Sequence, residues 1–283
     1  MTAAILPFPH AQRTQLSAVP ERTAELEARV ETLQQQYAEL NTAIFEAAQV
    51  HRRLCAPSMV HYGAFDIASE IFAVRHLPGD FFAIEETSEG MVLALGDIGG
   101  KGLAAGMWVP HLAGLIRNYT AENSSPETIV AGVNRDFARL SAVAPLSSLF
   151  VARLNGDSGL LDYCSAGHPP ALLLRAGGEF EHLSDGGPVL GVVPAAKFDC
   201  GTVQLHHDDA VLICSDGILE SFDESDQEFG SRRLEAEFRR AYGGSAEAML
   251  FSVLGAVQDF AAPRPLTDDM TLVLITKRER SQP

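Results

Sequence analysis

Short apolar segments bounded by glycine, proline or aspartate recur from residue 90 onward, and they constrain the fold more than any other feature. They are GMVLALGD (90–97), SSLFVARLN (147–155), GLLDYCSAG (159–167), PALLLRAGG (170–178), DAVLICSDG (209–217) and MTLVLITKR (270–278). Each segment has the length and composition of a β-strand. Because several follow one another without a helix between them, the sequence predicts antiparallel α+β layers rather than a doubly wound parallel sheet.

Three segments between and after these strands have helical spacing. The first runs from Leu103 to Tyr119, and Pro110 is expected to kink it. The second, residues 125–142, begins at Ser125, which is a good N-cap residue. The third covers residues 245–261.

Residues 23–54 contain neither glycine nor proline and form a heptad pattern. Its apolar positions are Leu26, Val30, Leu33, Tyr37, Leu40, Ile44 and Ala47. We expect a coiled-coil linker helix over residues 23–55 that pairs with a second copy of the chain as a homodimer. A helix that lies on its own domain is the alternative. Residues 1–22, with three prolines, are predicted to be a disordered tail, and residues 56–278 to form the main domain.

Composition excludes several classes of function. The formal net charge of −16 argues against nucleic acid and anionic membranes as partners. No apolar segment approaches the roughly 20 residues of a membrane span, and the N-terminus does not resemble a secretion signal, so we expect a cytoplasmic protein. The four cysteines lack the spacing of a zinc site.

The segment GDIGGKGLAAG (96–106) follows an apolar strand and raises two possibilities, a nucleotide-binding loop or a metal site. Its glycines do not match the register of either a P-loop or a dinucleotide-binding loop. A metal site requires further carboxylates at strand ends, and Asp80, Asp216 and the pair Asp268–Asp269 are placed in this way beside Asp97. Oxygen ligands favour Mg²⁺ or Mn²⁺ over Zn²⁺.

Six ordered motifs resemble those of the PPM-type serine/threonine phosphatases. They are GDFF (79–82), GDIGGKGLAA (96–105), SAGHPPALLL (165–174), SDGILES (215–221), FGSRRLEA (229–236) and TDDMT (267–271). The nearest branch is the bacterial one typified by the stage II sporulation phosphatase E and by regulators of the general stress sigma factor. The resemblance extends from about residue 44 to about residue 277.

The resemblance implies an αββα sandwich of two antiparallel sheets flanked by helices, with two divalent cations, Mn²⁺ or Mg²⁺, at the strand ends. Asp97 would bridge both cations and act with Asp216 as a catalytic residue. Asp216 and Asp268 would hold one cation, with Asp269 as the alternative to Asp268. The other cation would be served by Asp80, through water, and by the backbone carbonyl of Ile98. A water bridging the cations would attack phosphorus in line.

The resemblance also implies an activity and a partner. The expected enzyme is a phosphoprotein phosphatase that acts on phosphoserine or phosphothreonine. In this branch the substrate is a small phosphorylated anti-sigma-factor antagonist. Lys101 and His168 are candidate substrate-binding residues, against the simpler interpretation of a solvated lysine and a structural histidine.

Two departures from the family pattern favour an alternative function. Ala83 stands where the branch often has a second aspartate, and the histidine that follows the bridging aspartate in eukaryotic type 2C enzymes is absent here. The alternative is a catalytically weak or inactive binding module in a partner-switching pathway. The core aspartates are all retained, which favours the enzyme.

Overall fold

The computed structural model describes residues 10–55, 59–74, 76–140 and 145–277, without the side chains of residues 10–21. The chain divides into two compact units, Met1–Ala47 and Ala48–Pro283. The first contains most of one long helix and the second contains both sheets.

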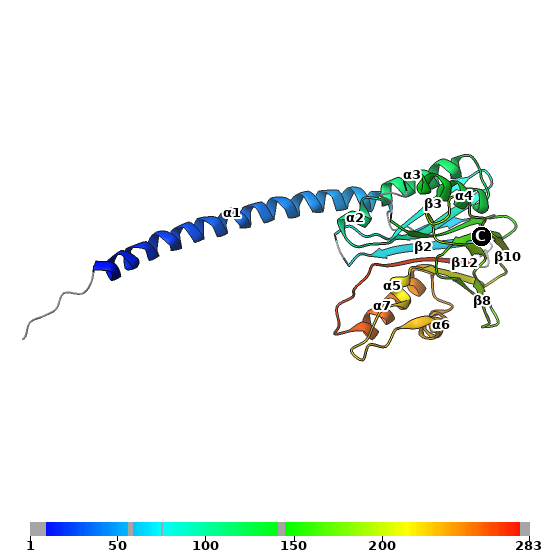
Figure 1. Cartoon of the computed structure of the whole chain (residues 1–283). Coiled ribbons are helices and arrows are strands. Elements are labelled where there is room, and N and C mark those ends of the chain that lie inside the picture. Colours follow the sequence, from blue (N-terminus) through cyan, green and yellow to red (C-terminus); the bar gives the residue numbers. More distant parts are fainter. Residues whose placement is uncertain (1–9, 56–58, 75, 141–144, 278–283) are drawn as a thin grey trace, which may run out of the picture. The chain divides into compact units, whose positions relative to one another are not determined.

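Helix α1 spans His10–Leu54 (Figure 1). The helix therefore begins before residue 23, where the sequence predicted its start. Residues 10–22 have no heptad pattern, but this shows only that they lack an apolar face, and a helix can form without one. Residues 1–9 of the expected disordered tail lie outside the described residues. The first five heptad positions, Leu26 to Leu40, are solvent-exposed, from 52% at Val30 to 67% at Tyr37, whereas Ile44 is half-buried. No helix in the described ranges is both long enough and apolar enough to cross a bilayer.

The second unit contains two mainly antiparallel sheets. The first sheet has the strand order β1 (Met59–Tyr62), β2 (Phe65–Phe72), β12 (Met270–Lys277), β11 (Ala210–Cys214), β7 (Ala171–Leu174) and β8 (Phe180–Leu183). The second has the order β10 (Cys200–Gln204), β6 (Leu160–Ala166), β5 (Ser147–Leu154), β4 (Gly90–Ile98) and β3 (Phe81–Thr87), with β9 (Gly186–Gly187) parallel to β6. All six segments predicted as strands are strands.

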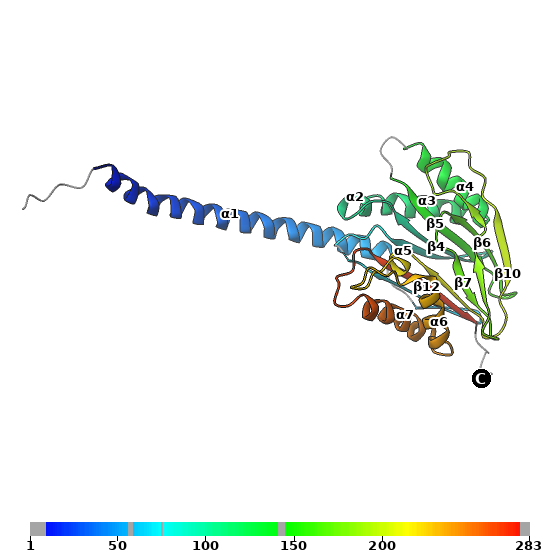
Figure 2. The ribbon, with the colours of Figure 1, turned by 60° about the horizontal axis from the view of Figure 1, so that its bottom comes forward.

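Helices cover the outer face of each sheet (Figures 1 and 2). On the second sheet lie α2 (Leu103–Gly106), α3 (Val109–Ala121) and α4 (Pro126–Ala138). On the first lie α5 (Asp216–Leu219), α6 (Gly230–Ala241) and α7 (Ala246–Ala261). The predicted αββα sandwich is confirmed.

The predicted kink at Pro110 is instead a break between two helices. Helix α2 ends at Gly106, and Pro110 occupies the first turn of α3, where a missing backbone N–H costs nothing. The prediction for Ser125 is confirmed, because its hydroxyl oxygen accepts a hydrogen bond from Thr128 N and caps α4. Ser245 caps α7 in the same way through Ala248 N.

Buried apolar side chains from both sheets fill the space between them. Leu93 and Phe150 project from the second sheet, and Ile213 and Val273 project from the first. Neighbouring residues on these strands face the helices instead, as Leu272 and Leu274 do toward α7. Strands buried on both faces explain why their sequences are almost continuously apolar.

The pairing register brings chemically important strand ends together. Strands β3 and β4 pair Phe81 with Gly96, so Asp80 and Asp97 lie at the same edge of the second sheet. Strands β11 and β12 pair Cys214 with Leu272, so the loops that carry Asp216 and Asp268 adjoin at an edge of the first sheet.

We predict that Phe150→Ala lowers the free energy of unfolding by about 3–5 kcal/mol, because it opens a cavity between the sheets. Phe150 is fully buried and stacks on Tyr163 with ring centroids 5.8 Å apart. Urea denaturation measures the loss. Phe251→Ala on α7 is the matched control, since Phe251 is 48% exposed. Equal losses in the two variants would contradict this account of the core.

Candidate metal centre

Asp97 stands at the centre of a group of interacting aspartates. It is the second-to-last residue of β4, and Ser147 Oγ donates a hydrogen bond of 2.7 Å to its backbone oxygen. Burial, and then the charges of Asp216, Asp268 and Asp269, raise the pKa of the Asp97 carboxyl to about 6. These three neighbours adjoin β11 and β12 of the first sheet, whereas Asp97 lies on β4 of the second, so the structure brings predicted site residues of both sheets together.

Asp80 is almost completely buried and is anchored by two hydroxyl groups. Ser215 Oγ and Thr271 Oγ1 donate hydrogen bonds of 2.7 and 2.6 Å to Asp80 Oδ2. Burial, and then the charge of Asp97, raise the pKa of Asp80 well above its usual range. Both hydroxyl donors belong to the first sheet whereas Asp80 precedes β3 of the second, so these hydrogen bonds fasten the two sheets at the site.

The adjacent residues Asp268 and Asp269 have different surroundings. Asp269 is buried, and its carboxylate accepts hydrogen bonds from Val74 N at 2.8 Å and Gly79 N at 3.0 Å. Asp268 has a half-exposed side chain. Asp269 therefore holds the loop that leads to Asp80, while Asp268 retains the accessibility that a metal ligand needs.

Close backbone contact positions Asp216 at the start of α5. A Cβ atom on the next residue, Gly217, would lie 2.0 Å from the Asp269 carbonyl oxygen, so only glycine allows α5 to approach the start of β12 this closely. Burial, and then the charge of Asp268, raise the pKa of Asp216. On the other side of the site Ile98 is buried, and its carbonyl oxygen would lie 3.0 Å from a Cβ atom added at Gly79.

Lys101 places a positive charge among these carboxylates. Its Nζ atom lies 3.1 Å from Asp268 Oδ2 and donates a hydrogen bond of 3.3 Å to the Thr267 carbonyl oxygen. Lys101 also lowers the pKa of Asp216. The structure thus brings Lys101 to the site, where it pairs with a carboxylate.

The donor set fits a hard divalent cation in its chemistry. Within the described ranges, no three Asp, Glu, His or Cys side chains are already directed at a common point as metal ligands would be. The carboxylates nevertheless lie close enough for neighbouring charges to raise the pKa values of Asp97 and Asp216, so a cation among them would relieve repulsion between like charges. Carboxylate and carbonyl oxygens suit Mg²⁺ and Mn²⁺.

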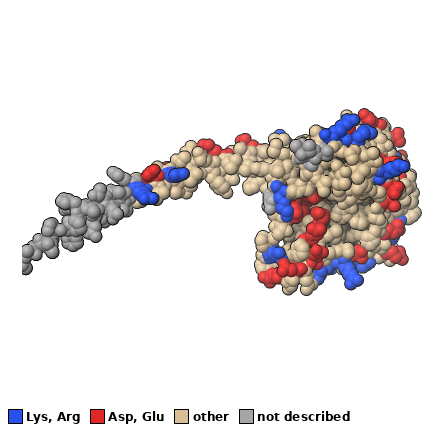
Figure 3. Space-filling view, in the orientation of Figure 1, with Lys and Arg blue, Asp and Glu red and all other residues tan. Residues whose placement is uncertain are grey.

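Asp97 borders two cavities. The larger, of about 530 Å³, is lined by Asp97, Asp216, Ser148 and His168 among others. The smaller, of about 10 Å³, lies between Asp97, Lys101 and Asp268. In Figure 3, acidic side chains gather on the visible face of the second unit. The arrangement places a cluster of carboxylates beside an open cavity that can admit a phosphorylated side chain.

His168 borders the larger cavity, and its two ring nitrogens have different surroundings. Its Nδ1 lies 3.0 Å from the Pro169 carbonyl oxygen, which can only accept, so Nδ1 carries the hydrogen. Its buried Nε2 has no hydrogen-bond partner within the described part of the chain. Burial lowers the pKa of His168 to about 4, so the ring is neutral at pH 7.

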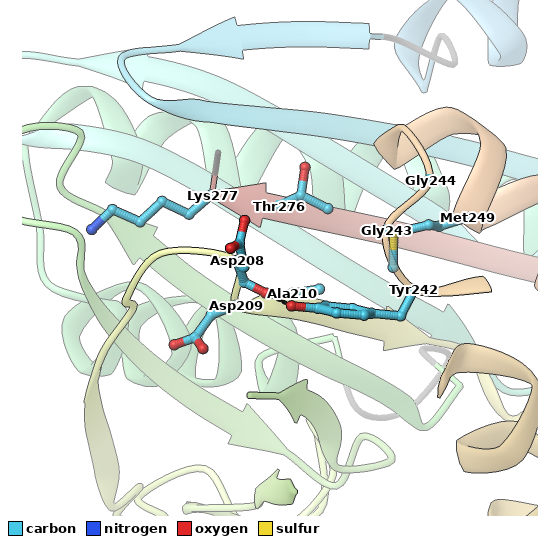
Figure 4. Close-up of a pocket in the computed structure, with 9 residues that line it drawn as sticks. All are labelled: Asp208, Asp209, Ala210, Tyr242, Gly243, Gly244, Met249, Thr276 and Lys277. Atoms are coloured by element: carbon cyan, nitrogen blue, oxygen red, sulfur yellow. Dashed lines mark hydrogen bonds between the residues drawn. The ribbon is translucent and has the colours of Figure 1, made fainter. Parts of the chain in front are cut away.

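Another cavity, of about 450 Å³, lies at the opposite ends of β11 and β12 (Figure 4). Tyr242 donates its hydroxyl hydrogen to the Asp208 carbonyl oxygen at 2.7 Å. The Asp209 carboxylate is paired with Arg175 at 2.6 Å. This cavity is separate from the carboxylate cluster and takes no part in it.

Ala83 lies away from the carboxylate cluster. It is buried on β3 opposite Ala94, in the apolar layer between the second sheet and its helices. The absence of an aspartate at this position therefore removes no carboxylate from the group around Asp97. Sequence reasoning missed Ser215 and Thr271; their hydroxyl groups beside the SDG and TDDMT motifs were the available signal.

Comparisons with known proteins agree with this fold. Residues 87–278 match the family model described as stage II sporulation protein E. The phosphoserine phosphatase RsbU of Bacillus subtilis (strain 168) is 24% identical over 245 residues, which cover 85% of this chain and 71% of RsbU.

Solved structures share the architecture. The RsbU and RsbW domains of Rv1364c from Mycobacterium tuberculosis superpose with a TM-score of 0.71 and 23% identity, over 81% of this chain and 64% of that one. The catalytic domain of the serine/threonine protein phosphatase PstP, solved in complex with two manganese ions, gives a TM-score of 0.54 and 15% identity over 76% of this chain and 99% of that one.

We predict that Asp97→Asn stabilises the metal-free protein at pH 7 by about 1–3 kcal/mol. The pKa of Asp97 is raised in the folded state, so its ionisation opposes folding as pH rises from about 4 through about 6. The gain should therefore be absent near pH 4 and complete at pH 7. Urea denaturation in the presence of a chelator measures it.

The same variant should lose most of the increase in melting temperature that Mn²⁺ gives the unsubstituted protein. Asp157→Asn, in the exposed turn between β5 and β6, is the matched control and should change neither quantity. An Asp97→Asn protein with unchanged stability and an unchanged response to Mn²⁺ would contradict the metal centre.

Proposed function

This chain belongs to the stage II sporulation protein E family, and we propose that it is a metal-dependent phosphatase that hydrolyses phosphoserine or phosphothreonine on a regulatory protein. One observation carries the proposal. Asp97, within electrostatic reach of Asp216 and Asp268, borders a cavity of about 530 Å³ that is open to solvent. Carboxylates gathered beside a cavity of this size suit the binding of cations next to a phosphate ester.

We assign the cation ligands as follows. Asp97 would contribute to both cation sites, Asp216 and Asp268 would hold one cation, and Asp80, through water, with the Ile98 carbonyl would serve the other. When bound, two Mn²⁺ or Mg²⁺ ions activate a water and stabilise the attacking and leaving oxygens of an in-line displacement at phosphorus. The engagement of Asp269 by two backbone N–H groups supports the choice of Asp268.

The remaining residues of the site orient its ligands. Asp80 is held by Ser215 and Thr271, and this anchor fixes the loop that carries Asp80 to the ends of β11 and β12. Lys101 supplies a positive charge at the edge of the cluster, where it attracts the phosphate group of a substrate. His168 borders the cavity, which keeps it a candidate substrate-binding residue, but its Nε2 is buried and would have to become exposed to accept a hydrogen bond from the substrate chain.

The substrate we propose is a phosphorylated protein of the anti-sigma-factor antagonist type. The similarity to RsbU, and to a mycobacterial protein that joins RsbU and RsbW domains, supports this class. We also propose that the chain forms a homodimer through residues 23–54, since the heptad positions of α1 from Leu26 to Leu40 are exposed in the single chain.

The alternative, a binding module with little activity, rests partly on Ala83. The burial of Ala83 in the apolar layer weakens that argument. The absent histidine after Asp97 is the remaining one, and activity measurements decide between the two functions.

We predict Mn²⁺-dependent release of phosphate from a phosphoserine-containing protein and from a generic phosphomonoester. Asp97→Asn and Asp216→Asn should each lower kcat/KM by roughly a hundredfold or more, because each removes a proposed cation ligand. Asp157→Asn is the control. Full activity in either site variant would refute the ligand assignment, and inactivity of the unsubstituted protein on both substrates, with Mn²⁺ binding intact, would favour the binding module.

The dimer is tested by light scattering on the intact chain. We expect a dimer at micromolar concentration, and a shift to monomer when Leu33 and Leu40 are both replaced by Asp, because two charges would enter the apolar seam. Gln35→Asp adds a charge on the helix face opposite the seam and should leave the dimer intact. A monomeric unsubstituted protein would show that the seam is not used for pairing.

A further inference from the structure

Two cysteines stand directly opposite each other on neighbouring strands. Cys164 on β6 pairs with Cys200 on β10 in an antiparallel register. Opposed residues in such ladders have Cα atoms about 4.5 or 5.5 Å apart, and both values lie within the roughly 4.4–6.8 Å that a disulfide spans. Directly opposed side chains also lie on the same face of the sheet, so the thiols can meet without movement of the backbone.

The two thiols differ in accessibility. Cys164 is fully buried in the layer between the second sheet and its helices, and its Sγ is 3.5 Å from the Asp199 carbonyl oxygen. Cys200 is exposed on β10, the strand at the end of its sheet. A reagent in solution therefore reaches Cys200 first, and Cys164 is the nearby partner that can resolve the product.

The pKa shifts of the two thiols also indicate that Cys200 reacts first. Burial raises the pKa of Cys164, and its interaction with the Cys200 side chain raises it further. Burial also raises the pKa of Cys200, but the interaction with Cys164 lowers it. Cys164 is thus the donor in the hydrogen bond between the two side chains, and Cys200 forms a thiolate more readily. Because neither pKa falls below that of a free thiol, the reaction is expected to be slow.

We propose that Cys164 and Cys200 form a reversible cross-strand disulfide when the protein meets a peroxide. The Cys200 thiolate attacks one peroxide oxygen, the O–O bond breaks, and Cys200 becomes a sulfenic acid as water leaves. The Cys164 sulfur then attacks the Cys200 sulfur, the S–O bond breaks, and a second water leaves with the Cys164 proton. The two thiols are oxidised to one disulfide while hydrogen peroxide is reduced to two waters.

The bond would close a loop that contributes to the wall of the larger cavity. Strand β6 leads from Cys164 to Gly167 and His168, and Val189 lies in the segment that returns to β10; all three line that cavity. Neither cysteine lines it, so the disulfide would restrain this wall without occupying the site.

The experiment treats the intact, reduced protein with hydrogen peroxide and follows free thiols and mass. We expect the loss of two thiols and of two hydrogen atoms per chain, reversed by a small thiol reductant. Cleavage after Lys and Arg should yield residues 154–175 joined to residues 198–232. The oxidised form should also melt at a higher temperature, because the link constrains the unfolded chain. None of these readouts depends on phosphatase activity, so the proposed function can fail separately.

Two variants give the test its specificity. Cys200→Ser should abolish the joined peptides, whereas Cys214→Ala should retain them, which assigns the link although residues 198–232 contain both Cys200 and Cys214. Oxidation of Cys200 to sulfinic or sulfonic acid without a link would overturn the proposal. So would a disulfide between Cys200 residues of two chains, or a link that survives in Cys200→Ser.

Discussion

Repulsion among buried carboxylates is the constraint on which the proposed site depends. Asp80, Asp97 and Asp216 all have raised pKa values, because burial disfavours their ionised forms and their charges oppose one another. Such a group does not stay together without external support. The sandwich supplies it: the hydroxyl groups of Ser215 and Thr271 cross from one sheet to hold a carboxylate next to the other. The repulsion lowers stability at one edge of the fold. Extensive burial of apolar side chains between the sheets and beneath the helices offsets this loss.

The sequence was sufficient to predict the architecture where its patterns were strong. All six apolar segments are strands, since strands buried on both faces leave a nearly continuous apolar signal. The elements it did not identify carry weaker signals. Strand β10 is mostly half-buried or exposed, and helix α6 buries only Leu234 and Phe238 on an otherwise polar surface. The break before α3 was also missed, because a proline in the first turn of a new helix gives the same sequence signal as a proline that kinks one continuous helix.

The sequence identified the residues of the site better than it identified the role of each. Aspartates at strand ends could be recognised from the sequence, but two adjacent aspartates are chemically identical until their surroundings are known. Asp269 accepts two backbone hydrogen bonds, and Asp268 pairs with the ammonium group of Lys101. The same holds for His168: a histidine between a turn and two prolines has a structural explanation, and only the geometry shows which nitrogen is engaged and which is not.

Lys101 connects the glycine-rich segment to the charge of the site. The loop after β4 bends back so that the ammonium group lies beside Asp268, where it partly offsets a cluster that would otherwise contain only negative charge. A lysine carries one charge on a flexible stem, so its pairing with a half-exposed carboxylate is weak. A divalent cation held by Asp268, as proposed, would bring twice the charge and would displace this pairing. Under the proposed function, the ammonium group is then free to meet the phosphate of the substrate, and one residue serves the site both without and with its cations.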